Sequence, residues 1–274
     1  MSGWVIKGLR FFGVMLGIIV LTSFSIDATS TFQGSQSALS IFADKLTTGE
    51  CPAGMLLVNT GDRDFCIDKF EVSAGEKCPV SNPSSIADTA KNSNDASCIP
   101  VAESDKKPWT YVAQAQASQL CAREGKRLPS AEEWYLAALG TPDSISSCNS
   151  QGKLSETGEW EKCTSGVGAH DMIGNVWELI DGEVVDGKIS GRSIPNDGYV
   201  EKVDNDGIAT ETTDSPNVIY NNDYFWMKPD GRYVIMRGGF YGSRSDGGIY
   251  ATHSQIDHNF ASGAIGFRCV KFLE

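Results

Sequence analysis

The eight cysteines are the residues with the most evident chemistry in this 274-residue sequence. They are Cys51, Cys66, Cys78, Cys98, Cys121, Cys148, Cys163 and Cys269. Their number is even and no two are spaced as Cys-x-x-Cys, which disfavours zinc binding and favours disulfides. Four disulfides indicate an oxidising compartment. Spacing does not assign the partners, and proximity alone suggests the local pairs Cys51–Cys66, Cys78–Cys98 and Cys148–Cys163.

A second candidate for chemistry is the segment of residues 240–264, which reads FYGSRSDGGIYATHSQIDHNFASGA. Aromatic residues stand here between small polar ones, a composition typical of recognition loops. His253 and His258 share one loop, so the two rings could meet at a metal, although histidines in such loops more often lie at the surface without one. We expect the ligand-binding residues of this segment to be Tyr241, Ser243, Tyr250, His253, Asp257 and His258.

The rest of the sequence does not indicate other common catalytic sites. It contains no Gly-x-Ser-x-Gly motif and no phosphate-binding glycine loop. Charged residues make up 21% of the chain and the formal net charge is −12, which argues against nucleic acid as a partner because phosphate binding needs clustered Lys and Arg. An acidic balance suits a protein that works outside the cytoplasm, and most of this charge is expected to be solvated surface.

The strands that would position these residues are short. Apolar runs at residues 55–58 and 65–67 predict two strands around the polar turn of residues 61–64. Residues 234–237 and 265–270 are the best strand candidates in the second half of the chain. Many turns between short runs predict the α+β class with much irregular structure.

Two helices are expected between these strands. Apolar residues at helical spacing predict the first over about residues 113–124. Ser130 and Glu133 form a capping box, which predicts that a second helix starts there and continues to Leu139. Residues 79–106 are rich in Ser, Asn, Asp and Pro and predict one long exposed loop.

Four short motifs occur in order within residues 51–271. They are Gly125-Lys126-Arg127-Leu128-Pro129-Ser130 followed by Glu133-Trp134, then Ile173-Gly174-Asn175-Val176-Trp177-Glu178, then Arg237-Gly238-Gly239, and finally Gly266-Phe267-Arg268-Cys269. On these motifs the chain resembles the formylglycine-generating enzymes, also called sulfatase-modifying factors. The resemblance implies a disulfide-stapled α+β domain with this family's variant of the C-type-lectin-like fold.

The resemblance gives most motif residues a structural role. Trp134 and Trp177 are expected to be apolar anchors of the core. Arg268 is expected to lie in a buried ion pair with an acidic partner. The resemblance also implies a disulfide between Cys121 and Cys269.

The catalytic positions are where the resemblance breaks. Family members that oxidise a sulfatase cysteine bind copper through two cysteines that follow the Arg-Gly-Gly motif. Aligned on residues 237–239, this chain has Ser243 and Gly248 at those positions and no cysteine between Gly239 and Gly266. A hydroxyl and a hydrogen atom cannot replace the thiolates that suit a soft cuprous ion, so we expect no catalytic residues and no copper. The His-x-x-x-His-x-Glu iron motif of the related sulfoxide synthases is also absent.

Calcium is the cofactor that the resemblance does imply. In the family, calcium lies near the segment that matches residues 173–178, so Asn175 and Glu178 are the candidate metal ligands. Amide and carboxylate oxygens suit Ca²⁺. An equally supported interpretation is that these two side chains satisfy backbone groups in a turn.

The N-terminal region differs from the rest. Residues 11–26 carry no charge and follow the basic residues Lys7 and Arg10, a pattern typical of a signal peptide or an uncleaved membrane anchor. We therefore expect a signal peptide or N-terminal anchor over residues 1–30, a polar linker over 31–50 and the sulfatase-modifying-factor-like domain over 51–274. The protein would be secreted, or anchored to the outer face of the cell membrane by its N-terminal segment.

Two functions follow from these observations. The first is a non-catalytic domain that binds an extracellular ligand, a protein or a small molecule, through residues 240–264. The second is a formylglycine-generating-type oxidase that acts on a sulfatase cysteine with a rearranged site. The missing cysteine pair favours the first.

Overall fold

The computed structural model describes residues 50–273, so the expected signal peptide or anchor and almost all of the linker lie outside the described residues. No helix within residues 50–273 is long and apolar enough to cross a membrane. The helices of this part are α3 (Ile86–Asn94), α4 (Gln114–Arg123) and α5 (Ala131–Ala138), with the short 3-10 helices η2 (Val218–Tyr220) and η3 (Arg244–Asp246). Its strands are β1 (Met55–Val58), β2 (Phe65–Asp68), β3 (Ser73–Ala74), β4 (Pro100–Val101), β5 (Trp177–Val185), β6 (Lys188–Ile189), β7 (Arg192–Ser193), β8 (Gly198–Val203), β9 (Ala209–Thr213), β10 (Tyr224–Met227), β11 (Arg232–Arg237), β12 (Thr252–Ser254), β13 (Ile265–Phe267) and β14 (Val270–Phe272).

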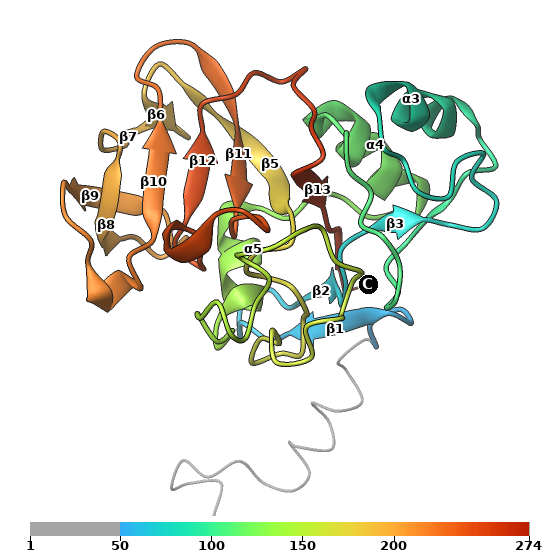
Figure 1. Ribbon diagram of the computed structural model, residues 1–274, viewed down its shortest axis with the longest axis horizontal. Helices are drawn as coiled ribbons and strands as arrows, with labels where there is room; N and C mark the ends of the chain where they lie inside the picture. The colour runs from blue at the N-terminus through green and yellow to red at the C-terminus, as the bar shows by residue number, and fades with distance from the viewer. Residues whose placement is uncertain (1–49, 274) are drawn as a thin grey trace, which may run out of the picture. The chain divides into compact units, whose positions relative to one another are not determined.

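A large mixed sheet carries most of the domain. Its strands follow the order β7-β6-β5-β11-β12-β10-β8-β9, and β13 pairs with β5 in parallel. Smaller sheets join β1, β2 and β14, and β3 with β4. Figure 1 shows α3 and α4 beside the end of the large sheet where β13 lies, and α5 below it. The combination of helices with a mixed sheet confirms the α+β class.

Strand β5 separates two hydrophobic clusters because successive side chains of a strand point to opposite faces. Trp177 and Leu179 pack on one face with Leu120 of α4. Ile180 packs on the other face with Trp134 of α5. Both tryptophans are buried, which confirms their role as core anchors.

The local sequence signals account for the hairpin and the second helix. Strands β1 and β2 pair antiparallel, with Leu57 opposite Cys66. At the start of α5 the Glu133 amide donates to Ser130 Oγ at 3.2 Å, and the Ser130 amide donates to the Glu133 carboxylate at 2.8 Å. This reciprocal capping box satisfies two amide groups that the first turn of a helix leaves without partners.

The last predicted strand is divided into two. β13 ends at Phe267 and pairs with β5, whereas β14 begins at Val270 and pairs with β2 in a different sheet. Arg268 and Cys269 form the junction, and both are buried. An apolar run shows that a segment is buried, but it does not show that the chain changes sheets within it.

The prediction of one long exposed loop over residues 79–106 is wrong for α3. Ser85 begins this helix, because its hydroxyl accepts from the Asp88 amide at 3.2 Å. Asn92, near the end of α3, holds the segment that precedes the helix. Its side-chain oxygen accepts from the Val80 amide at 2.9 Å, and its side-chain nitrogen donates to the Val80 carbonyl at 2.8 Å. These contacts are polar, so the helix carries no apolar stripe that would have predicted it.

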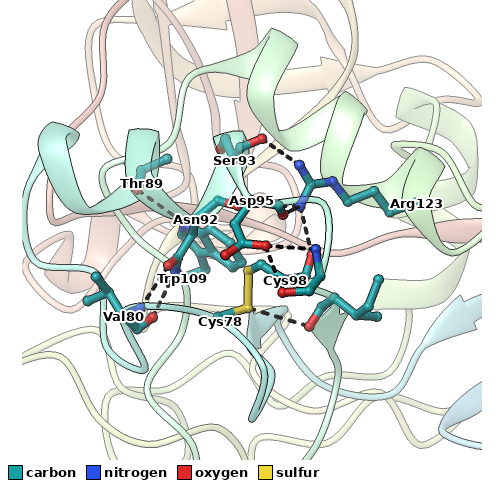
Figure 2. The surroundings of a disulfide bond; sticks show 11 residues. Cys78, Val80, Thr89, Asn92, Ser93, Asp95, Cys98, Trp109 and Arg123 are labelled. Atoms are coloured by element: carbon teal, nitrogen blue, oxygen red, sulfur yellow. Dashed lines mark hydrogen bonds between the residues drawn. A yellow bond between two sulfur atoms is a disulfide. The ribbon is translucent and has the colours of Figure 1, made fainter.

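Arg123, the last residue of α4, holds the C-terminal end of α3 (Figure 2). Its guanidinium donates to the carbonyls of Asn92, Asp95 and Cys98 at 3.4, 2.9 and 2.7 Å. A cation at this place is favourable because the final carbonyls of a helix have no partners within it. The helix thus depends on a residue outside residues 79–106, which local sequence patterns cannot reveal.

All eight cysteines lie in the described part of the chain and all form disulfides. The local pairs Cys51–Cys66, Cys78–Cys98 and Cys148–Cys163 are confirmed. The disulfide that the family resemblance implied, Cys121–Cys269, is also confirmed, and it links α4 to the junction between β13 and β14.

The disulfides should differ in their contribution to stability. Cys121–Cys269 closes 148 residues and Cys51–Cys66 closes 15. In the chain-entropy account, a disulfide stabilises the fold by reducing the conformational entropy of the unfolded chain. The bond that closes the longer loop reduces it more, which is worth about 2 kcal/mol of extra stability. We therefore expect Cys121→Ala with Cys269→Ala to lower the free energy of unfolding by about 2 kcal/mol more than Cys51→Ala with Cys66→Ala in urea titrations. An equal or larger loss from the short pair would contradict this ranking.

Candidate functional site

A buried ion pair lies at the centre of the motif residues. The Arg268 guanidinium donates to Glu178 through Nε at 2.8 and 2.9 Å and through Nη2 at 2.6 Å. The remaining donors reach the carbonyls of Asp68 at 3.0 Å and His170 at 2.7 Å. Trp134 Nε1 donates to Glu178 Oε2 at 2.6 Å. Both charged side chains are almost fully buried, so the expected buried ion pair of Arg268 is confirmed, and it joins β5, α5 and the β13–β14 junction.

Asn175 belongs to a neighbouring hydrogen-bond network. Its side-chain oxygen accepts from Asn149 Nδ2 at 3.2 Å and from the Ser155 amide at 2.9 Å. Its side-chain nitrogen donates to Glu71 Oε2 at 2.6 Å, and Glu71 Oε1 accepts from the Val176 amide at 3.3 Å. The 149–155 segment is thereby tied to the 175–178 segment.

The charges of this region perturb one another. Burial raises the pKa of Glu71 well above its usual range, and the nearby carboxylates of Asp171 and Glu178 raise it further. Burial also raises the pKa of Asp171 to about 6. Burial alone would lower the pKa of Arg268, but the Glu178 carboxylate outweighs it and raises that pKa. Arg268 therefore stays charged, whereas burial and two neighbouring carboxylates favour the protonated form of Glu71.

The residues expected to bind calcium do not offer free oxygens. Both oxygens of Glu178 accept from Arg268, and the side-chain oxygen of Asn175 accepts from two N–H donors. Within residues 50–273, no three or more His, Cys, Asp and Glu side chains are grouped so that they could hold a metal ion. This arrangement does not fit calcium held by Asn175 and Glu178, and calcium binding by the chain stays a prediction.

Ser243 and Gly248, the two residues expected at the positions of the family's copper cysteines, lie in the interior. Ser243 is 9% exposed and its hydroxyl accepts from the Phe240 amide at 2.9 Å. Gly248 is buried against two carboxyl groups: a Cβ added to it would stand 2.2 Å from Asp143 Oδ2 and 2.2 Å from Asp223 Oδ1. Burial raises the pKa of Asp143 to about 6 and that of Asp223 well above its usual range. A side chain larger than hydrogen therefore has no room at residue 248.

The six residues expected to bind a ligand do not form one cluster. The Tyr241 amide donates to the Asn175 carbonyl at 3.0 Å. The Tyr250 ring packs with those of Tyr135 and Tyr220, with centroids 5.9 and 5.1 Å away. His258 Nε2 lies 3.0 Å from a carboxylate oxygen of Glu183. Asp257 is exposed, Ser243 is buried, and His253 belongs to the separate aromatic group described next.

An aromatic row crosses the large sheet; we use this name for Tyr199, Tyr224, Trp226, His253 and Trp177. Its neighbouring rings lie 4.8 to 5.8 Å apart between centroids, from β8 through β10 and β12 to β5. Trp177 is buried and the other four are half-buried, so the row presents ring surface to solvent.

The row lies in an acidic surrounding. Burial raises the pKa of Tyr224, and the negative charges of Asp197, Asp214 and Asp246 contribute to that shift. Burial lowers the pKa of His253 to about 4, so its ring is neutral at pH 7. A partly exposed aromatic surface among carboxylates suits a ligand with apolar and cationic groups.

Sequence reasoning found His253 but missed its partners in the row and the Asp143–Asp223 pair. Tyr224 and Trp226 are separated by one residue in a strand, so alternation in the sequence Tyr224-Phe225-Trp226 could have indicated two rings on one face. Nothing in the sequence brings Asp143 and Asp223 together, since they are 80 positions apart in the chain.

The comparisons with known proteins fit this description. The profile of the family described as "Sulfatase-modifying factor enzyme 1-like domain" matches residues 53–273. Among solved structures, the Major Tropism Determinant P3c Variant is similar with a TM-score of 0.46 at 17% identity, covering 82% of this chain and 54% of that one. Treponema denticola variable protein 1 gives 0.45 at 16% identity over 81% and 93% of the two chains. PvdO from Pseudomonas aeruginosa gives 0.40 at 16% identity over 77% and 81%. The chain spans about half the length of the tropism determinants, and a search of curated proteins gives no match.

The buried ion pair should be far more important for stability than an exposed one. Glu178→Gln leaves the Arg268 charge buried without its counter-charge, which costs about 3–5 kcal/mol. Glu183 pairs with Arg232 at the surface, where both side chains are partly exposed, so Glu183→Gln should cost less than about 1 kcal/mol. Urea denaturation of the two variants measures the difference. Similar losses in both would contradict a central role for Arg268 and Glu178.

Proposed function

We propose that this chain, which belongs to the sulfatase-modifying factor enzyme 1-like family through residues 53–273, is a non-catalytic ligand-binding domain that works outside the cytoplasm. The family expected from the four motifs is confirmed by that match. The function is our inference, and one observation carries it: all eight cysteines are in disulfides, so the chain has no thiol to bind a cuprous ion or to react.

The surroundings of Ser243 and Gly248 support the proposal. The Ser243 hydroxyl is used within its own turn, where it accepts from the Phe240 amide. A cysteine at Gly248 would overlap the carboxylates of Asp143 and Asp223, which a Cβ at that position already meets at 2.2 Å. The position has therefore been adapted to the absence of a side chain. This differs from a catalytic site that lacks only its two ligands.

The ligand surface that we propose combines residues 240–264 with the aromatic row. The row adds rigid ring surface that costs little conformational entropy on binding, and the segment adds small polar groups for hydrogen bonds. Four disulfides fit an oxidising environment, in which such a surface would meet an extracellular ligand. The acidic groups near Tyr224 favour a ligand with a cationic part, such as a basic peptide segment.

The oxidase alternative has a direct test. The purified chain is incubated with copper, oxygen and a peptide that carries the sulfatase cysteine motif, and mass spectrometry measures conversion of cysteine to formylglycine. We expect no conversion above a copper-only control, while an active formylglycine-generating enzyme converts the same peptide. Turnover above that control would refute the non-catalytic assignment.

The binding surface is tested with a random peptide library displayed on phage and selected on the wild-type chain. Selected peptides should bind at least about tenfold more weakly, or about 1.4 kcal/mol, when Tyr224→Ser removes a ring from the aromatic row. Tyr241→Ser is compared with the wild-type chain in the same binding measurement and tests the part of the surface formed by residues 240–264. Ile86→Ser, an exposed apolar residue of α3, is the matched control and should leave binding unchanged.

The same variants show whether the surface is free or part of the core. Substitutions at a surface change stability by about 0.5 kcal/mol or less. Unchanged peptide binding by both tyrosine variants would reject this surface. A large loss of stability in either would identify that ring as part of the core and remove its recognition role.

A further inference from the structure

Three segments that are distant in sequence meet at Gly248. Asp143 follows α5, Asp223 directly precedes β10, and Gly248 lies between η3 and β12. Because Asp143 Oδ2 and Asp223 Oδ1 are each 2.2 Å from the same point, the place of a Cβ on Gly248, they can be no farther apart than twice that distance. Because Gly248 has no side chain, both carboxylate oxygens can approach its Cα, where a Cβ would collide with them.

Each of these two oxygens is buried and has no hydrogen-bond partner. Asp223 is fully buried, and its other oxygen accepts from the Tyr250 amide at 2.7 Å. Asp143 is half-buried and has a side-chain hydrogen bond with Asn221. The free oxygen of Asp223 is thus directed toward that of Asp143, where like charges would repel.

Within residues 50–273, no side-chain cation forms a salt bridge with Asp143 or Asp223. Arg237 is the basic group that acts on Asp223, but its guanidinium donates to the carbonyls of Asp206, Gly207 and Ile249. A buried carboxylate is stable when it is paired with a cation or coordinates a metal. The pair therefore lacks a positive partner.

We propose that Asp143 and Asp223 bind a hard divalent cation in front of Gly248, with water completing its coordination. Carboxylate oxygens without nitrogen or sulfur donors select Ca²⁺, Mg²⁺ or Mn²⁺ over copper or zinc. Water would approach the ion from the side of Asp143, the more exposed of the two residues. The position that the family resemblance gives to a thiol thus belongs to an oxygen-lined cation site in this chain.

Mn²⁺ is the probe, because its free ion gives an electron paramagnetic resonance signal that disappears on binding. The full chain, stripped with EDTA, should bind one Mn²⁺ at pH 7.5, and Ca²⁺ or Mg²⁺ should displace it. Asp223→Asn should abolish binding and Asp143→Asn should weaken it at least tenfold. Asp171→Asn changes another buried carboxyl group away from this pair and should leave Mn²⁺ binding unchanged.

Gly248→Ala keeps both carboxylates, but its Cβ would displace the two oxygens that it meets at 2.2 Å, so it should also abolish binding. It provides an independent test should Asp223→Asn not fold. The proposal is overturned if the wild-type chain binds no Mn²⁺, which would mean that the two carboxyl groups share a proton instead. It is equally overturned if Mn²⁺ binding persists in Gly248→Ala, or if Asp171→Asn loses it as Asp223→Asn does.

Discussion

The ion pair between Arg268 and Glu178 is the interaction on which the arrangement of this domain depends. Glu178 lies on β5 and Arg268 lies at the junction where the chain leaves the large sheet for the small one. Because burying either charge alone is costly, the pair requires Trp134 and the carbonyls of Asp68 and His170 to be in place together. Two motifs that are 90 residues apart are therefore one structural unit.

The neighbouring disulfide has a related role. Cys269 follows Arg268 directly and is bonded to Cys121 of α4, while its amide donates to Asp68 Oδ2 at 2.9 Å. The junction between β13 and β14 is thus held by a covalent bond, an ion pair and backbone hydrogen bonds.

The two groups of buried carboxyls differ in what compensates them. Near Glu178, the guanidinium of Arg268 supplies a positive charge, and burial and the neighbouring carboxylates raise the pKa of Glu71. At Gly248, the oxygens of Asp143 and Asp223 meet without a side-chain cation between them. The first group needs no bound ion, because Arg268 supplies its positive charge. The second group is the one for which we propose a bound cation.

The sequence predicted the parts of this structure that local chemistry determines. The capping box at Ser130 and Glu133, the first hairpin and the three local disulfides follow from residues that are close along the chain. The motif resemblance added the Cys121–Cys269 bond and the family. Helix α3 was not predicted, because it is held by Asn92 and Arg123. Their contacts are polar, and those of Arg123 join residues that are far apart in the sequence.

The candidate site was harder to predict than the fold. The aromatic row is assembled from four strands, and the carboxyl pair joins loops that only the folded chain brings together. The composition of residues 240–264 predicted a recognition segment, yet the six ligand-binding residues expected there lie in different parts of the structure and do not form one cluster. Composition indicated a recognition segment, but only tertiary structure shows which rings share a face.

We propose that this chain has an oxygen-lined cation site where the family resemblance places a thiol site. Crystals of the chain soaked separately in Mn²⁺ and in a cuprous salt, with diffraction measured at the absorption edge of each metal, test it most directly. The account predicts an anomalous peak for manganese between Asp143 and Asp223 and none for copper near Ser243 and Gly248. A copper peak at that position, or no manganese peak between the two carboxylates, would contradict it.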